Sequence, residues 1–241
     1  MYSNHLHYLP TQPLLVLLLG GLILGLLFLL QIGILNSAYR RLGLEPRVAM
    51  LVLLASLIGG YINIPIARLP EAHVVARTFV DVFGMPYLVP QAVDWPGTIL
   101  AVNVGGALIP VLLSLYLIVH DRILVSSAIA TAVVAVIVHQ LATPIPGVGI
   151  SVPLFVPPLV AALTAVALSR RYAAPLAYIG GSLGVLIGAD LTNLGQLQTL
   201  GAPVASIGGA GTFDGVFLTG IVAVLLSALG ERPAPGARRP A

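Results

Sequence analysis

The sequence predicts an all-α membrane protein of about seven transmembrane helices, with one short β-hairpin insert. Composition is the first reason, because 58% of the 241 residues are hydrophobic and only 8% are charged, against a usual charged share of about 25%. The second is the spacing of apolar runs of about 20 residues, the length that crosses a ~30 Å hydrocarbon core. We expect one domain at 13–230, between an extracytoplasmic tail at 1–12 and a disordered cytoplasmic tail at 231–241.

The first apolar run, residues 13–35, is read as a retained helix. It is longer than the 7–15 residues of a signal peptide's apolar region and no charged segment precedes it. The remaining helices are expected at 47–66, 98–119, 123–142, 154–169, 175–199 and 212–229. Pro157 and Pro158 predict a kink in the fifth of the seven. Residues 143–153 are too rich in proline and glycine to be helical throughout, and 200–211 are a linker.

The insert at residues 67–97 is the one sizeable polar segment between helices. Its β-branched and aromatic run before Gly84, Met85 and Pro86 suits a short β-hairpin over the helix ends. An amphipathic interfacial helix over 71–83 is the alternative. Trp95 fits an interfacial anchor in either case.

Arginines orient the chain, because short cytoplasmic loops carry the positive charge. An outside N-terminus places nine arginines in the cytoplasm and leaves Arg68 and Arg77 outside. We therefore expect a multi-pass protein of the inner (plasma) membrane, with a cytoplasmic C-terminus and an extracytoplasmic insert. The basic residues are scattered in short clusters, which indicates topology and no nucleic-acid partner. The absence of cysteine excludes disulfides and thiolate metal sites.

Two aspartates lie inside or at the edge of apolar segments, Asp190 in the sixth helix and Asp214 at the start of the seventh. A carboxylate near the bilayer centre costs roughly 2.5–3.5 kcal/mol on insertion scales, which makes each a functional-site hypothesis. At 1.5 Å per residue, Asp190 lies about 22 Å from the cytoplasmic end of its helix, and Asp214 enters from the same outer side. The pair predicts an acid and a base that share a proton. The structural alternatives are a hydrogen bond across the bundle for Asp190 and a helix cap for Asp214.

Other polar or glycine positions gather near these aspartates, whereas the inner halves of the helices carry almost nothing polar. The pattern favours a recessed site open to the outside over a through-channel. The expected substrate-binding residues are Asn63, Asn103, His139, Asn193, Gly209 and Gly211. The asparagines at 63 and 103 also fit helix–helix contacts, and the glycines an anion-binding nest or a turn. His139 with the aspartates offers nitrogen and oxygen ligands, but a lone histidine is more often structural, and the sequence calls for no metal or cofactor.

The sixth helix carries glycines at every fourth position, Gly180, Gly184 and Gly188. This spacing lets a neighbouring helix backbone approach closely. Asp190 follows about 200° round the helix, so it is expected to point away from the glycine seam.

Four motifs carry a family resemblance: NVGGALIPVLLS at 103–114, HQLATPIPGVGI at 139–150, GADLTNL at 188–194 and GTFDGVFLTG at 211–220. In this layout the chain resembles an uncharacterised prokaryotic membrane family known only as domain of unknown function 1614. That resemblance implies no activity.

The motifs around the two aspartates are also similar to those of intramembrane aspartyl proteases of the presenilin and signal peptide peptidase type. Ala189-Asp190-Leu191 is similar to the first of their motifs, and Gly209-Ala210-Gly211 before Phe213-Asp214-Gly215 to the second. The resemblance implies a water-activating base and an acid. The chain departs from these families in the two residues between Gly211 and Asp214 and in lacking a later Pro-Ala-Leu motif.

The preferred interpretation is an aspartyl intramembrane protease or hydrolase with an outward-opening carboxylate pair. Its substrate would be a membrane-embedded peptide or small molecule. A proton- or cation-coupled transporter that uses the same aspartates is the alternative, and a non-catalytic membrane assembly subunit is the second.

Overall fold

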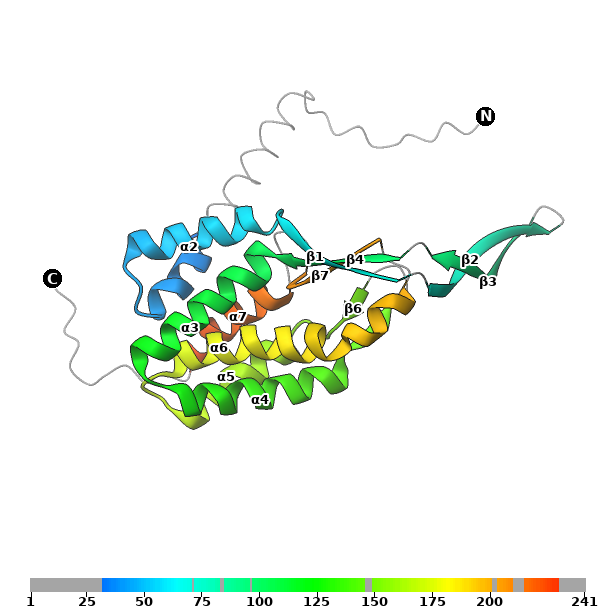
Figure 1. The fold of residues 1–241 in the computed structure, drawn as a ribbon. Helices are drawn as coiled ribbons and strands as arrows, with labels where there is room; N and C mark the ends of the chain where they lie inside the picture. The colour runs from blue at the N-terminus through cyan, green and yellow to red at the C-terminus, as the bar shows by residue number, and fades with distance from the viewer. Residues whose placement is uncertain are drawn as a thin grey trace, which may run out of the picture.

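The computed structural model describes residues 32–70, 72–82, 85–95, 97–145, 149–200, 203–209 and 215–229. Both tails and most of the expected first helix lie outside these residues. The helices, after a helical stretch at 32–41, are α2 (Pro46–Gly59), the π-helical η1 (Val104–Leu108), α3 (Ile109–Asp121), α4 (Leu124–Leu141), α5 (Val156–Leu168), α6 (Ala173–Val185), the π-helical η2 (Leu186–Asp190), the 3-10 helix η3 (Leu191–Leu200) and α7 (Gly215–Leu229) (Figure 1). The strands are β1 (Asn63–Leu69), β2 (Ala72–Val82), β3 (Met85–Trp95), β4 (Thr98–Asn103), β5 (Thr143–Ile145), β6 (Gly149–Ser151) and β7 (Val204–Ile207).

Three helical stretches of the described chain are long and apolar enough to cross a membrane. They are Val104–Asp121, Leu124–Leu141 and Ala173–Gln196, of 18, 18 and 24 residues, with mean hydropathies of 1.7, 2.0 and 1.4. The helices α2, α5 and α7 have only 14, 13 and 15 residues, short of the ~20 that a crossing needs. The chain is thus mainly helical with three candidate spans, and the seven crossings stay a prediction.

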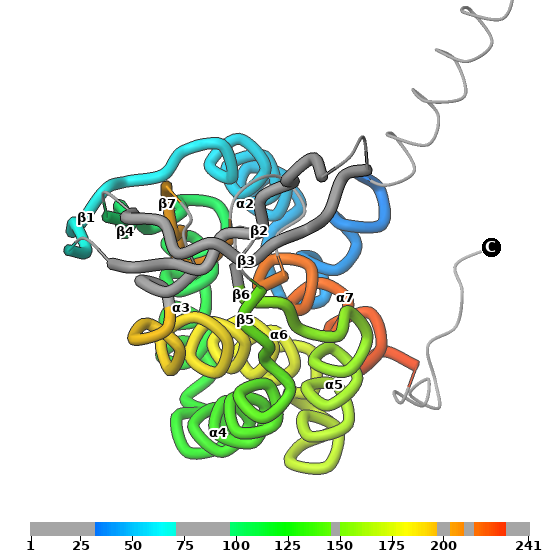
Figure 2. Tube along the Cα trace, turned by 90° about the vertical axis from the view of Figure 1, so that its right-hand side faces the viewer, coloured from blue at the N-terminus to red at the C-terminus, as the bar shows by residue number. Residues whose placement is uncertain are grey.

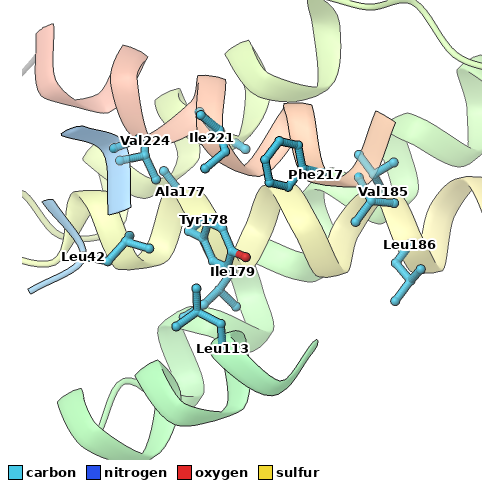
Figure 3. Close-up of a cluster of buried hydrophobic side chains, with 14 of the residues drawn as sticks. Leu42, Leu113, Ala177, Tyr178, Ile179, Val185, Leu186, Phe217, Ile221 and Val224 are labelled. Carbon is cyan, nitrogen blue, oxygen red and sulfur yellow. The ribbon is translucent and has the colours of Figure 1, made fainter. Parts of the chain in front are cut away.

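The helix α6 is the centre of the bundle, with α3, α4, α5 and α7 around it (Figure 2). Its expected glycine seam is confirmed, and it faces α4. A Cβ at Gly184 would lie 2.5 Å from Cβ of Val134, and one at Gly188 would lie 2.9 Å from Cα of Ala135. On another face, α6 packs apolar side chains against those of α7, including Phe217 (Figure 3). A helix so enclosed can hold a side chain in a fixed place.

The domain is not all-α, because a three-stranded sheet in the order β1-β4-β7 joins the ends of several helices. β1 and β4 are antiparallel, whereas β4 and β7 are parallel. The expectations of helix through residue 66 and from residue 98 were wrong: α2 ends at Gly59, and residues 98–103 form β4. Pro65 cannot lie inside a helix without losing a hydrogen bond, and the β-branched residues around it and in β4 favour a strand.

The hairpin in the insert is confirmed, and the alternative of an interfacial helix is wrong. β2 and β3 pair antiparallel from Ala72 with Trp95 to Val82 with Met85, a longer hairpin than expected. Residues 143–145 and 149–151 are also not helical, since β5 and β6 pair with each other. Pro157 and Pro158 lie in the first turn of α5, where proline costs little, so they start the helix and do not kink it.

Candidate functional site

Asp190 ends the π-helical turn η2, which interrupts the sixth helix between α6 and η3. A π-helical turn inside an α-helix is uncommon and is frequently found at functional sites. The Asp190 side chain is half-buried. Its Oδ2 accepts a hydrogen bond of 2.7 Å from the backbone N–H of Gly208. The irregular helix therefore presents the carboxylate to the turn that follows β7.

This turn needs glycine at residue 208. Gly208 and Gly209 have φ of 85° and 74°, in the left-handed region that favours glycine. A Cβ at Gly208 would also lie 2.6 Å from both N and Cβ of Ala107 in η1. In this turn the backbone amide of Gly208 binds the protein's own carboxylate.

Asp190 lines a cavity of about 780 Å³ between the helices and the small strands. Apolar side chains form most of its wall. Its polar side chains are Asp190, Asn63, Ser151, Ser206 and Thr219, and Asp190 is the one ionisable group among the described lining residues. All four residues of β7 line the same cavity. A strand and a carboxylate thus face one largely apolar space.

An asparagine network holds the β1, β4 and β7 wall together. Asn103 is fully buried; its Nδ2 donates to the Gly60 carbonyl at 2.8 Å and to Oδ1 of Asn63 at 3.0 Å. Its Oδ1 accepts from the Gly106 N–H at 2.7 Å, which caps η1. Ser206 of β7 donates to the same Asn63 oxygen. Asn63 therefore lines the cavity, while Asn103 supports it from behind.

Asn193 and His139 make contacts away from the cavity. The buried Asn193 amide donates to the Ala189 carbonyl at 2.8 Å and to the Gly188 carbonyl at 3.2 Å, on its own irregular helix. Nδ1 of the exposed His139 lies 2.9 Å from Oγ1 of Thr192. Neither residue is among those that line the cavity. Within the part of the chain that the structure describes, no group of three His, Cys, Asp or Glu side chains is placed to hold a metal ion.

Asp214 and Gly211 lie outside the described residues, so their contacts stay unassigned. The residues on either side of that gap are informative, because Gly209 and Gly215 both line the cavity with Asp190. The described chain thus lines this cavity at residue 209 and again at residue 215.

Three hydroxyl residues of the cavity were not expected from the sequence: Ser151, Ser206 and Thr219. Single serines and threonines in apolar segments are common, so no local pattern marks them. A strand pattern at residues 204–207 could have pointed to Ser206. The stretch is too short, however, for its apolar and polar residues to be distinguished from the linker.

The fold and the site define a mainly helical protein with candidate membrane spans and a carboxylate-bearing cavity beside a small sheet. The chain belongs to the DUF1614 family, described as a protein of unknown function, whose family model matches residues 57–226. No curated protein and no solved structure matches the chain. The similarity to presenilin-type proteases therefore stays a prediction from the two aspartate motifs.

Proposed function

We propose that the protein is an intramembrane aspartyl hydrolase that cleaves a membrane-embedded peptide, with Asp190 and Asp214 as its catalytic pair. The observation that carries this proposal is the cavity itself. Asp190 lines it together with Gly209 and Gly215, and Gly215 is bonded directly to Asp214. The proposal brings the Asp214 carboxylate to this same cavity, because an aspartyl mechanism first requires a carboxylate pair at one site.

The reaction needs the two carboxyl groups in different protonation states. The ionised one draws a proton from water as the water oxygen attacks the scissile carbonyl carbon. The protonated one donates a hydrogen bond to the carbonyl oxygen and polarises it. When the carbon–nitrogen bond breaks, the leaving amine takes up the proton that the first carboxylate drew from water, and both carboxyl groups return to their starting states. The motif resemblance implies that one aspartate of the pair is the base and the other the acid.

The cavity wall suits a peptide better than a compact polar solute. Among the described strands β7 pairs with β4 on one side only, and all of its residues line the cavity. An extended peptide can add to such a free strand edge through main-chain hydrogen bonds while its side chains enter apolar space. The β7 edge would therefore place a scissile bond near Asp190.

The proposal includes seven crossings of the inner membrane, with an outside N-terminus and the cavity open to the outside. The short helices α5 and α7 are consistent with this because the cavity and the sheet adjoin their ends. Non-helical backbone is tolerated at membrane depth where it is buried in protein or lines a cavity. Residues 152–154, before α5, and 204–207 with 209, before α7, supply such lining.

The test is cleavage of single-span peptides co-reconstituted with the purified protein, with new termini identified by mass spectrometry. Wild type should release fragments, and Asp190→Asn or Asp214→Asn should abolish release. Asp121→Asn is the matched control, since Asp121 ends α3 and does not line the cavity.

The second candidate is a proton- or cation-coupled carrier, favoured by the single ionisable side chain among the described lining residues. Absence of fragments across a broad peptide panel, together with Asp190-dependent proton or cation flux, would replace the hydrolase with this carrier. Absence of both activities would favour the assembly subunit.

A further inference from the structure

Four hydroxyl groups meet in the interior of the bundle, outside the site described above. They belong to Tyr39, to Ser56 of α2 and to Tyr178 and Ser182 of α6, and we call them the hydroxyl cluster. Each of these residues is at most 3% exposed. Tyr178 and Ser182 are one helical turn apart and so lie on the same face of α6. Figure 3 shows the Tyr178 hydroxyl oxygen among apolar side chains.

Two short distances connect residues of the cluster. The Tyr39 hydroxyl is 3.5 Å from Oγ of Ser56, and the Tyr39 and Tyr178 ring centroids are 6.1 Å apart. Gly220 of α7 closes one side. A Cβ there would lie 3.2 Å from Cε2 of Tyr178 and would collide with Oγ of Ser182. Glycine at residue 220 thus leaves room for both hydroxyl side chains in their present positions.

The cluster has unused hydrogen-bonding capacity. No well-formed hydrogen bond joins the Tyr178 or the Ser182 hydroxyl to a described residue, although the hydroxyls of Tyr39 and Ser182 lie close to that of Tyr178. A hydroxyl can donate one hydrogen bond and accept two. Burying it unpaired is costly, and buried water commonly satisfies such groups when two to four polar partners surround it. The Tyr178 and Ser182 hydroxyls, with the Tyr39–Ser56 pair beside them, provide that number.

The cluster adjoins the inner end of the cavity through Thr219. Thr219 lines the cavity and is 5% exposed. Its Cγ2 lies 3.3 Å from the position of a Cβ on Gly181, the residue before Ser182. The next residue of α7, Gly220, contacts the cluster itself. Asp190 follows Ser182 by eight residues, about 12 Å along the helix.

We propose that the hydroxyl cluster is an internal water-binding site that continues the Asp190 cavity into the bundle. Water held there satisfies Tyr178 and Ser182 and reaches the cavity past Thr219. If the protein is the proposed hydrolase, this water-binding site would supply the attacking water when a peptide fills the rest of the cavity. The water site itself does not depend on that activity.

Thiol accessibility tests the proposal, since the chain has no native cysteine. The probe is methanethiosulfonate ethylammonium added to the purified protein without substrate. Thiols react as thiolates, which form in water, so Ser182→Cys should react within about tenfold of the rate of Ser151→Cys on the cavity wall. Ser227→Cys is the control, because Ser227 is buried in α7 with its hydroxyl already donating to the Val224 carbonyl. It should react at least about a hundredfold more slowly.

Thermal stability gives a second, independent result. A water-bound hydroxyl contributes to stability, so Ser182→Ala and Tyr178→Phe should each lower Tm. A buried hydroxyl without water or another partner destabilises the fold, so its removal should raise Tm. A Ser182→Cys rate equal to that of Ser227→Cys, or a raised Tm in both variants, would overturn the water site. Because neither measurement uses a substrate, failure here is distinguishable from failure of the hydrolase proposal.

Discussion

Gly188→Ala should loosen the contact between α4 and α6 and displace Asp190. A Cβ at Gly188 would collide with the carbonyl oxygen of Ala135 and lie 2.9 and 3.0 Å from its Cα and C atoms. These are backbone atoms that cannot rotate away, and ordinary contacts begin at 3.4 Å. The helices must therefore separate by up to about one ångström in a close-packed interior, because the carbonyl oxygen is the nearest of these atoms. The separation would begin two residues before Asp190.

The expected cost follows from two opposing effects. Overpacking typically costs about 1–3 kcal/mol, whereas replacing a helical glycine by alanine returns about 0.5–1 kcal/mol. The net loss of about 1–2 kcal/mol should lower Tm by about 2–8 °C for a chain of this size. Thermal unfolding of the purified protein in detergent measures it. Peptide cleavage should fall as well, because Asp190 moves.

Gly195→Ala is the matched control in the same helical stretch, since nothing lies within 4 Å of a Cβ at Gly195. Its Tm should stay equal to wild type or rise slightly. If Gly188→Ala left Tm unchanged and kept full activity, the close packing of α4 on η2 would not position the site.

Three further predictions concern the wall, the orientation and the catalytic unit. Asn103→Ala should lower Tm by about 4–8 °C, since it removes three hydrogen bonds and leaves buried partners unpaired; an unchanged Tm would show that the network is dispensable. In intact cells, Met85→Cys should react with an impermeant thiol reagent added outside and Gly43→Cys should not; the reverse pattern would invert the topology. In the cleavage assay, the double variant Asp190→Asn/Asp214→Asn should be about as inactive as either single variant, because the pair acts as a unit; additive losses would mean separate roles.

The sequence predicted the parts of the fold that depend on long periodic patterns. The mainly helical fold with candidate membrane spans, the close helix contact at the glycine seam and the hairpin between residues 72 and 95 are confirmed. The β1-β4-β7 sheet was missed because its three strands come from distant segments of the chain. Residues 98–103 are apolar and β-branched, a composition that a short stretch can use in either a strand or a helix.

In the candidate site, too, single residues could be predicted from the sequence, whereas contacts between distant segments could not. An aspartate in an apolar helix is visible in sequence, and Asp190 does line the cavity. The sequence showed the turn that binds Asp190 only as a group of glycines. The hydrogen bond between Asp190 and Gly208 could not be predicted, because it depends on how the sheet places the turn. The buried hydroxyl cluster was not expected from the sequence. Tyr39, Ser56, Tyr178 and Ser182 come from separate helical segments, and only packing brings them together.

The central claim is that Asp190 and Asp214 meet at one cavity, and disulfide crosslinking of Asp190→Cys with Asp214→Cys tests it most directly. Two cysteines can bridge only when their Cα atoms lie within about 7 Å and their side chains face each other. The account predicts an intramolecular disulfide under mild oxidation, detected by mass spectrometry of the digested protein, and none for Asp190→Cys with Asp121→Cys. Failure of the 190–214 pair to crosslink, in a variant that remains folded, would contradict the carboxylate pair.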